Sequence, residues 1–257
     1  MILTVDIGNT AITLGGFEGD TLGFVARLST RPADTADELA VRLLDVLTLY
    51  GVQPADLTGA IVASVVPPLN AAMRGALARL LPCEPMFVAP GIKSGIGIRC
   101  DMPSSVGADI IAACVAVHYL YGSPALILDL GTATKMTVVS RGGAFIGTAI
   151  APGVRMGLDA LAEGTAQLPR IELERPASVI AKNTTDCMRS GVLYGHAAML
   201  DGMIDRIVEE HGEPLRVYAT GGMAEEVIPL CRHAIAVDPD LVLKGLHLLY
   251  QKNTPAD

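Results

Sequence analysis

Short apolar runs alternate with polar turns along the chain, and this pattern predicts strands and helices in mixed order. The chain opens with three strand-like runs, and a hairpin turn at 18–20 separates the second from the third. Elsewhere apolar residues recur at helical spacing or form short runs between turn residues. Strands are therefore predicted over 2–6, 11–17, 22–27, 59–64, 86–88, 125–129, 136–139, 144–150 and 217–219, and helices over 34–50, 67–81, 110–120, 154–162, 185–210 and 241–250.

The series of three strands followed by alternating helices and strands occurs twice, and the second series begins at residue 125. Each series is what a ribonuclease-H-like half requires. The chain is therefore predicted to be an α/β protein of two ribonuclease-H-like domains, 1–121 and 122–257. The tail at 251–257 is expected to fray.

A similar polar turn follows the first strand of each half. The first reads Asp6-Ile-Gly-Asn-Thr10 and the second Asp129-Leu-Gly-Thr-Ala-Thr134. A carboxylate at a strand end can hold a hydrated Mg²⁺, and the glycine lets the backbone approach a bulky anion. Successive N–H groups and hydroxyls can cradle phosphate. Either turn alone is typical of an ordinary strand end, but the pair indicates a polyphosphate gripped from two sides.

Both turns resemble the phosphate motifs of the acetate and sugar kinase/Hsp70/actin superfamily, and the chain as a whole resembles the type III pantothenate kinases. Further segments match that family in order and spacing. They are 64–68, 107–109, 149–153, 165–169, 182–184, 190–191, 220–222 and 241–246. The resemblance implies an actin-like ATPase fold, with a nucleotide cleft between the domains. It also implies ATP-dependent phosphorylation of pantothenate to 4'-phosphopantothenate, the first step of coenzyme A biosynthesis.

The same resemblance implies a role for individual residues. ATP would bind at Asp6, Ile7, Gly8, Asn9, Thr10, Ala11, Ile12, Thr13, Gly131, Thr132, Gly221 and Gly222. Pantothenate would bind at Cys100, Gly107, Ala108, Asp109, Ile110 and Thr184. Asp109 would be the general base that orients the attacking hydroxyl, and Asp129 would hold a monovalent cation, K⁺ or NH₄⁺, with Mg²⁺ accompanying ATP.

Three of these positions also have ordinary structural explanations. An aspartate such as Asp109 is favoured in the first turn of any helix. Thr184 would suit the cap of the helix that begins beside it. The segment 220–222 reads equally well as an ordinary turn between a strand and a helix.

The acceptor side departs from the family pattern. The family's Arg after the catalytic Asp, which contacts pantothenate, is Ile110 here, and an Asn three residues on is Ala113. The family's Tyr-x-Asn-Pro reads Cys100-Asp-Met-Pro103, and its Thr-Phe-Asp after the second phosphate turn reads Lys135-Met-Thr137. Leaving a substrate polar group unpaired would cost about 1–3 kcal/mol.

Three interpretations of these departures remain open. Another cationic residue compensates, with Lys135, Arg99 and Arg155 as candidates. The kinase, or a phosphatase, acts on a different small acceptor. Or the protein is a nucleotide-binding regulatory homologue without turnover, although the retained aspartates count against this.

The composition of the chain limits the kinds of partner that it is expected to bind. The chain has 257 residues, is 51% apolar and 18% charged, and carries a net charge of −8 without any run of Lys or Arg, which argues against nucleic acid and anionic membranes. No apolar run approaches the roughly 20 residues of a membrane span, and no basic leader precedes the first strand. The low charged fraction and the resemblance predict a homodimer formed through the second half.

Cysteine and histidine usage adds two expectations. The five cysteines include no C-x-x-C pair, which predicts reduced thiols and a cytoplasmic location. The five histidines lack the spacing of metal ligands, and His118 and His196 are expected to be packed within apolar helices.

Overall fold

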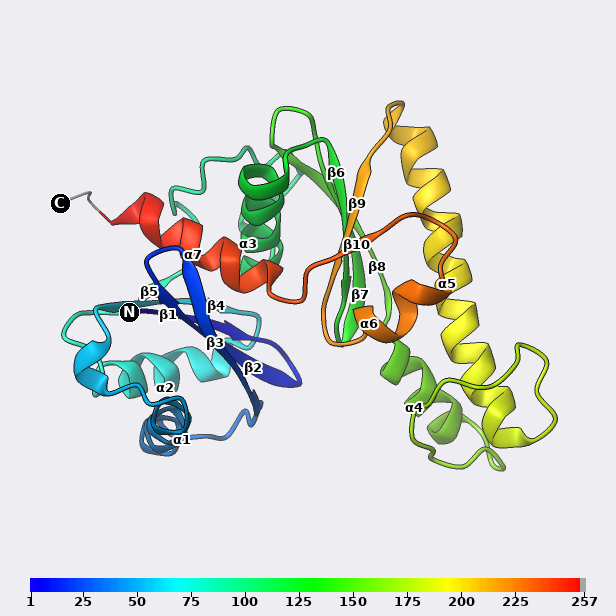
Figure 1. Cartoon of the computed structure of the whole chain (residues 1–257), viewed down its shortest axis with the longest axis horizontal. Helices are drawn as coiled ribbons and strands as arrows, with labels where there is room; N and C mark the ends of the chain where they lie inside the picture. Colours follow the sequence, from blue (N-terminus) through cyan, green and yellow to red (C-terminus); the bar gives the residue numbers. More distant parts are fainter. Residues whose placement is uncertain (255–257) are drawn as a thin grey trace. The chain divides into compact units, whose positions relative to one another are not determined.

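The computed structural model describes residues 1–254 and contains two α/β units (Figure 1). The first unit comprises Met1–Leu120 together with the chain from Asp240, and the second comprises Tyr121–Pro239. The first contains β1 (Ile2–Ile7), β2 (Ala11–Glu18), β3 (Thr21–Ser29), α1 (Ala36–Leu49), β4 (Gly59–Ser64), α2 (Pro67–Leu77), β5 (Met86–Phe87), α3 (Ala108–Ala116) and α7 (Leu241–Asn253). The second contains β6 (Ala125–Leu130), β7 (Ala133–Val139), β8 (Phe145–Pro152), α4 (Val154–Gly164), α5 (Thr184–His211), β9 (Arg216–Thr220), α6 (Ala224–Val227) and β10 (Ala236–Val237).

The two units share one sheet topology. The first sheet has the order β3-β2-β1-β4-β5, and the second has the order β8-β7-β6-β9-β10. In each, the first three strands form antiparallel hairpins, and the next strand returns parallel to the first. The prediction of two ribonuclease-H-like α/β halves is confirmed, and each half is built on a mixed sheet.

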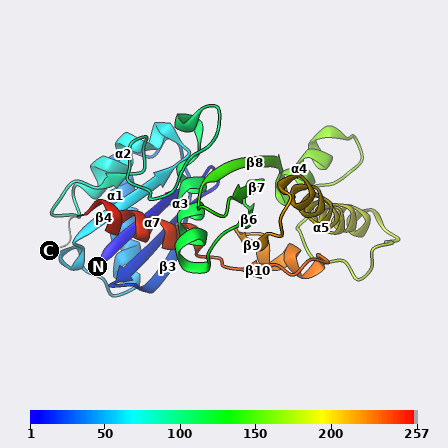
Figure 2. The ribbon, with the colours of Figure 1, turned by 90° about the horizontal axis from the view of Figure 1, so that it is seen from above.

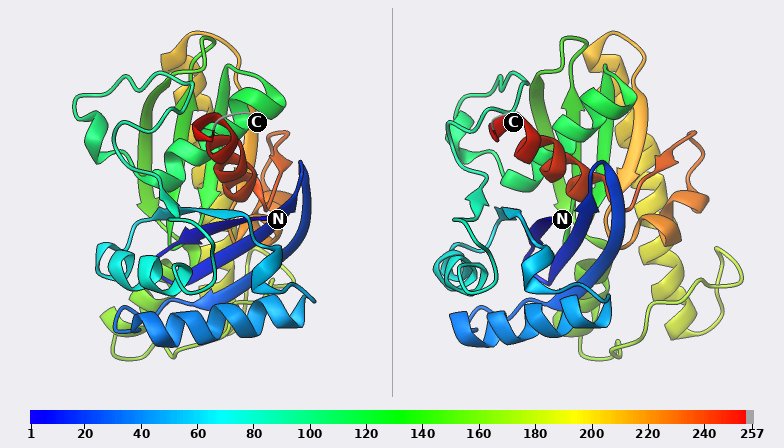
Figure 3. Two further views of the ribbon diagram at one scale, coloured as in Figure 1. Left: turned by 90° about the vertical axis from the view of Figure 1, so that its left-hand side faces the viewer. Right: turned by 60° about the vertical axis from the view of Figure 1, so that its left-hand side comes forward.

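Helices cover both faces of the first sheet, because the central strand β4 carries apolar side chains on both sides. On one face, Leu3 and Val5 of β1 pack with residues of α1 and α2 such as Leu43 and Met73. On the other, Ile61 of β4 packs with α3 and α7 through residues that include Ile111, Leu246 and Leu249. Helices α3 and α7 lie side by side in Figures 2 and 3.

In the second unit, α5 covers one face of the sheet. Leu126, Leu128 and Leu130 alternate along β6 and pack against α5 residues that recur at helical spacing. The α5 residues are Leu193, Ala197, Leu200 and Ile204. Since neighbouring strand residues point to opposite faces, Asp129 lies on the face opposite α5.

The C-terminal helix departs from the predicted domain division. The structure places α7 in the first unit, whereas the sequence division assigned everything after residue 121 to the second. The physical reason is the apolar face of α7, which is buried against α3 and β4. The helix also continues to Asn253, whose side-chain amide donates to Lys93 O and Leu249 O at 3.0 and 2.8 Å. Residues 251–253 are thus ordered, and 255–257 lie outside the described residues.

Several element bounds also differ from the prediction. Helix α2 ends at Leu77, and α3 ends at Ala116 with a π-helical turn following over Val117–Tyr121. The short elements α6 and β10 carry too few residues to show a period, and the sequence pattern missed them. Nowhere in residues 1–254 does a helix combine the length and apolarity needed to cross a membrane.

Candidate functional site

The first polar turn joins β1 to β2 and is held in shape by a threonine that follows β3. Gly8 N donates to Ala11 O at 2.9 Å, and Thr30 donates from its hydroxyl to Gly8 O at 2.6 Å and from its N–H to Thr10 O at 3.0 Å. Asn9 and Thr10 are exposed at the tip. The turn therefore presents backbone and side-chain donors on a fixed backbone, as a phosphate site requires.

Asp6 lies one residue before this turn, on the sheet face covered by α3 and α7. It pairs in register with Ala63, and Ala63 packs in the cluster that contains α3. Residues in register on neighbouring strands share a face. The side chain of Asp6 is half-buried.

The second turn, 131–133, is enclosed by two glycines from distant parts of the same unit. Gly153, the N-cap of α4, donates from its N–H to Thr132 O at 3.2 Å, and an added Cβ would lie 2.6 Å from Gly131 O. Gly221 has φ +92°, and an added Cβ would lie 2.6 Å from Leu130 C. Both positions therefore need glycine, because any side chain would overlap backbone atoms of the turn.

This packing brings the N-terminus of α4 against the second turn. The first N–H groups of an α-helix have no intrahelical acceptor, and the helix dipole makes this end partially positive. The turn, with Thr132 exposed, therefore lies beside an end of a helix that favours a phosphate group.

Asp109 lies in the first turn of α3, after the N-cap Gly107. Its Oδ1 accepts the N–H of Ile110 at 2.9 Å. Negative charge is favoured at this end of a helix, so the position suits an aspartate. Burial, with a smaller contribution from the charge of Asp109, raises the pKa of the Cys114 thiol to about 12, so Cys114 is a packing residue and not a nucleophile.

The acceptor residues are divided between the two units. Cys100, Gly107, Ala108 and Ile110 belong to the first unit, and all are half-buried. Thr184 belongs to the second, where it is the first residue of α5. The N-cap of that helix is Asn183, whose side chain accepts from Asp186 N at 2.9 Å, so the capping explanation for Thr184 is wrong.

Thr184 lines a pocket of about 570 Å³ in the second unit. The pocket is bordered by Leu161, Leu168, Ala181, Lys182, Asn183, Thr184, Cys187 and Met188. Its apolar lining includes Leu161 of α4 and Met188 of α5, and its polar lining lies at and just before the start of α5. Such a mixture suits a small organic molecule that carries polar groups.

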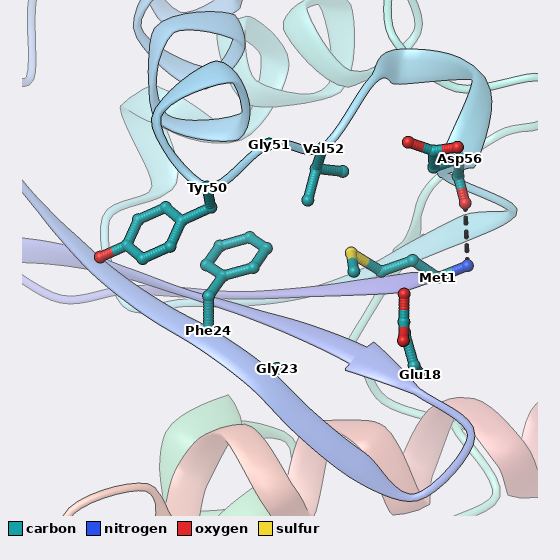
Figure 4. A pocket seen from close by; sticks show the side chains of 8 residues that line it. All are labelled: Met1, Glu18, Gly23, Phe24, Tyr50, Gly51, Val52 and Asp56. Carbon is teal, nitrogen blue, oxygen red and sulfur yellow. Dashed lines mark hydrogen bonds between the residues drawn. The ribbon is translucent and has the colours of Figure 1, made fainter.

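A second pocket, of about 500 Å³, lies in the first unit, away from every predicted site residue (Figure 4). It is lined by Met1, Glu18, Gly23, Phe24, Tyr50, Gly51, Val52 and Asp56. The Met1 ammonium donates to the backbone oxygen of Asp56 at 2.8 Å. The carboxylates of Glu18 and Asp56 and the absence of Lys and Arg from the lining make this pocket unsuited to phosphate.

Comparison with known proteins decides the family. A family model described as type III pantothenate kinase matches residues 2–206. The chain belongs to the type III pantothenate kinase family. The resemblance seen in the sequence is therefore confirmed. Membership makes the chain a phosphotransferase and supports ATP-dependent phosphorylation of pantothenate in coenzyme A biosynthesis as its function.

Curated relatives extend this match over almost the whole chain. The type III pantothenate kinase of Moorella thermoacetica is 41% identical over 254 residues, covering 99% of this chain and 100% of its own. That of Dehalococcoides mccartyi is 42% identical over 252 residues, with 98% of each chain covered. That of Geobacillus thermodenitrificans is 40% identical over 254 residues, covering 99% and 98%.

Solved structures at lower identity share the fold. Component A of the (R)-2-hydroxyglutaryl-CoA dehydratase of Acidaminococcus fermentans has a TM-score of 0.58 at 14% identity, covering 97% of this chain and 96% of its own. The activator of the 2-hydroxyisocaproyl-CoA dehydratase of Clostridium difficile, solved with bound ADPNP, has a TM-score of 0.55 at 13% identity, covering 100% and 98%. These neighbours confirm the actin-like ATPase fold class.

The type III pantothenate kinase resemblance implied a monovalent cation on Asp129, and the residues present do not fit one. The ammonium of Lys135 lies 2.6 Å from Asp129 Oδ2. A free cation bound to this carboxylate would lie beside a resident positive charge. Across residues 1–254, His, Cys, Asp and Glu side chains form no group of three or more suited to a metal ion.

Two contributors to the site escaped the sequence analysis. Thr30 lies 20 or more residues from the turn that it braces, at a separation of 22 from Gly8. Gly153 was noticed only as part of a matching segment, without its contact to the second turn. Both act through tertiary contacts. The only local sign of a role for Gly153 was its position as a small residue directly before a predicted helix.

Proposed function

We propose that this kinase binds the phosphates of ATP at the turns after β1 and β6, and that Asp109 orients the pantothenate hydroxyl that attacks the γ-phosphate. The observation that carries the proposal is the repetition of one turn at equivalent strand ends of two sheets with the same order. Each turn supplies backbone donors, hydroxyls and an aspartate. The remaining predicted contacts, including Gly221 and Gly222, belong to the same proposal.

The phosphates would be stabilised mainly by positioning and fixed charge. The N–H groups of the turns and the N-terminus of α4 need no rearrangement to receive negative charge. The carboxylate of Asp6 is an oxygen ligand of the kind that Mg²⁺ prefers, directly or through its water shell. When bound with ATP, Mg²⁺ neutralises charge on the transferring phosphoryl group.

Asp109 would act on the acceptor hydroxyl. A carboxylate in phosphoryl transfer serves chiefly to orient the nucleophile and to accept its proton as the new bond forms. General base catalysis of this kind contributes about 10²–10⁴-fold.

The residues proposed to contact the acceptor are Thr184 of the second unit and Cys100 and Ile110 of the first. Ile110 cannot pair with a carboxylate, and Lys135, one of three candidate replacements, is already paired with Asp129. Arg99 and Arg155 remain as the candidates for contacting the pantothenate carboxylate. Ile110 also favours a second candidate function, a kinase for a less charged hydroxyl acceptor.

The deciding experiment is a coupled ADP-release assay with ATP, Mg²⁺ and pantothenate, made on the native chain, Asp109→Asn and Asp45→Asn. We expect turnover that requires pantothenate and falls about 100-fold or more in Asp109→Asn. Asp45 is exposed on α1 and serves as the control, with activity expected to stay at the native level. ATP binding, measured separately by calorimetry, should persist in both variants.

Two other results would redirect the proposal. ATP binding without pantothenate turnover, followed by turnover with another hydroxyl compound, would establish the second candidate function. ATP binding without turnover on any acceptor would support a regulatory homologue and reject the kinase.

The proposal includes a homodimer formed through the second unit. The second unit exposes large apolar side chains on β8, on α4 and in the loop before α5. They are Ile150, Met156, Val179 and Ile180. Sedimentation should give a dimer for the native chain and a monomer for the double variant Ile150→Lys with Met156→Glu. A native monomer would reject the dimer.

A cytoplasmic location is also proposed, in keeping with soluble metabolism and with thiols that remain reduced. The free cysteines are Cys83, Cys100, Cys114, Cys187 and Cys231.

A further inference from the structure

We infer that the ammonium of Lys135 takes the place of a free monovalent cation at Asp129, so that ATP binding at the second turn needs neither K⁺ nor NH₄⁺. The inference rests on the proposed phosphate site at this turn. It concerns which cation pairs with the carboxylate of Asp129, and it involves only residues of the second unit.

The backbone places the two side chains together. Asp129 and Lys135 are direct register partners in the antiparallel pair of β6 and β7. Side chains directly opposite each other in such a pair lie on the same face with Cβ atoms about 4.5–5.5 Å apart. A lysine stem spans that distance easily, and the ammonium lies 2.6 Å from Asp129 Oδ2.

The pair is also shielded from water. The side chains of Lys135 and Asp129 retain 18% and 21% of their full exposure. A fully exposed ion pair would be weak, and ions from solution would easily replace either partner. A partly buried pair is screened less by salt, and its geometry is fixed at both ends by strand backbone. The backbone therefore holds the Lys135 ammonium beside Asp129, whereas K⁺ or NH₄⁺ would have to bind there from solution.

A tethered ammonium can supply the positive charge that a free cation would bring to this position. A lysine ammonium carries the same single charge as K⁺ or NH₄⁺, and it presents three N–H donors. One donor serves Asp129 Oδ2. The ammonium also places a positive charge beside the turn that is proposed to bind phosphate.

The first turn offers an internal comparison. Asp6 holds the same register position in its sheet, and its partner on β2 is Thr13, which carries no charge. A lysine opposite the aspartate is therefore not a general requirement of this hairpin. The two turns therefore differ in the residue that faces the carboxylate across the hairpin, which is Thr13 at the first turn and Lys135 at the second.

The test compares the native chain with Lys135→Ala and Lys93→Ala in buffers whose only monovalent cation is choline, with and without added K⁺. Lys93 lies exposed in a loop and is the control. ATP affinity is measured by calorimetry, and Tl⁺, a spectroscopic substitute for K⁺, is titrated and followed by ²⁰⁵Tl NMR. Turnover is recorded in parallel.

When K⁺ is added, we expect the ATP affinity of the native chain and of Lys93→Ala to change less than about twofold. The ATP affinity of Lys135→Ala is expected to rise about tenfold or more. Tl⁺ should bind saturably only to Lys135→Ala, and adding Asp129→Asn to that variant should abolish this binding. Lys135→Arg should keep the native independence from K⁺.

The inference is overturned if native ATP affinity rises about tenfold with K⁺, or if Tl⁺ binds the native chain at a site lost in Asp129→Asn. If Lys135→Ala does not fold, Lys135→Gln retains the stem without the charge, and the same criteria apply to it. ATP and Tl⁺ binding are independent of the acceptor. Failure of pantothenate turnover alone would therefore count against the proposed function and not against this inference.

Discussion

Asp6 and Asp129 hold the same register position in two sheets of the same strand order. Asp6 pairs with Thr13 across its hairpin and with Ala63 on the parallel strand. Asp129 pairs with Lys135 and Thr220 in the corresponding directions. The two halves therefore provide one scaffold twice, and they differ in the side chains that face each carboxylate.

Gly153 should be essential for ATP binding, and Gly157, one turn later in α4, should not. A methyl group at residue 153 would overlap the carbonyl oxygens of Gly131 and Thr132, which are backbone atoms and cannot move aside cheaply. Gly153→Ala is expected to weaken ATP binding by about tenfold or more, or roughly 1.4 kcal/mol. Calorimetric titration with ATP measures this.

Gly157→Ala provides the matched control. An added Cβ there meets no atom within 4 Å, and alanine is favoured over glycine inside a helix by roughly 0.5–1 kcal/mol. This variant should keep native ATP affinity and gain slightly in unfolding temperature. Equal ATP affinity in the two variants would show that the approach of α4 to the second turn has no part in binding.

Variants of Thr184 and Asn183 should show that these neighbouring residues have different roles, one in acceptor binding and the other in the stability of α5. Asn183→Ala removes the cap and is expected to lower the free energy of unfolding by about 1 kcal/mol. Thr184→Ala leaves that cap in place, so its stability should be native while the KM for pantothenate rises several-fold. Steady-state kinetics and urea unfolding of both variants measure the difference. A native KM in Thr184→Ala would remove Thr184 from the acceptor pocket.

His196 should make the protein less stable in mild acid. Burial lowers the pKa of this imidazole below its usual value of 6.5, and its Nε2 lies 2.9 Å from the hydroxyl of Thr134. Above pH 6.5 the ring is neutral in both states and its contribution is complete. As the pH falls below 6.5, the unfolded chain takes up the proton first, so stability declines until the pH reaches the lower pKa of the folded state.

Urea unfolding between pH 8 and about 5.5 measures this decline, which approaches about 1.4 kcal/mol per pH unit for one proton. His196→Gln should reduce the slope. His247 also has a pKa lowered by burial, with Asp20 opposing the shift, so part of the slope should remain. A native slope in His196→Gln would mean that His196 does not titrate in this range.

Much of the fold follows from local pattern. The repeated series of strands and helices was visible because an alternating or helical period depends only on nearby residues. Thr35 shows the same locality, since its capping box with Glu38 needs only the spacing of three residues. The aspartates of both turns were also recognisable, because each follows directly on its apolar strand.

Local pattern could not decide which distant segments pack together. Helix α7 reads as an apolar helix in either unit, and only its burial against α3 and β4 assigns it to the first. The sequence alone also could not tell which residue is the N-cap of α5, because Asn183 and Thr184 are adjacent and both can cap a helix.

By itself, therefore, the sequence determined the two α/β halves, their aspartate turns and the family. Only the tertiary structure decided that Lys135 pairs with Asp129 and that Gly153 closes on the second turn. The physical reason is that register and close approach depend on the pairing of whole strands and on the packing of helices against them. One residue of register shift would turn Lys135 to the opposite face of the sheet, without changing any local signal.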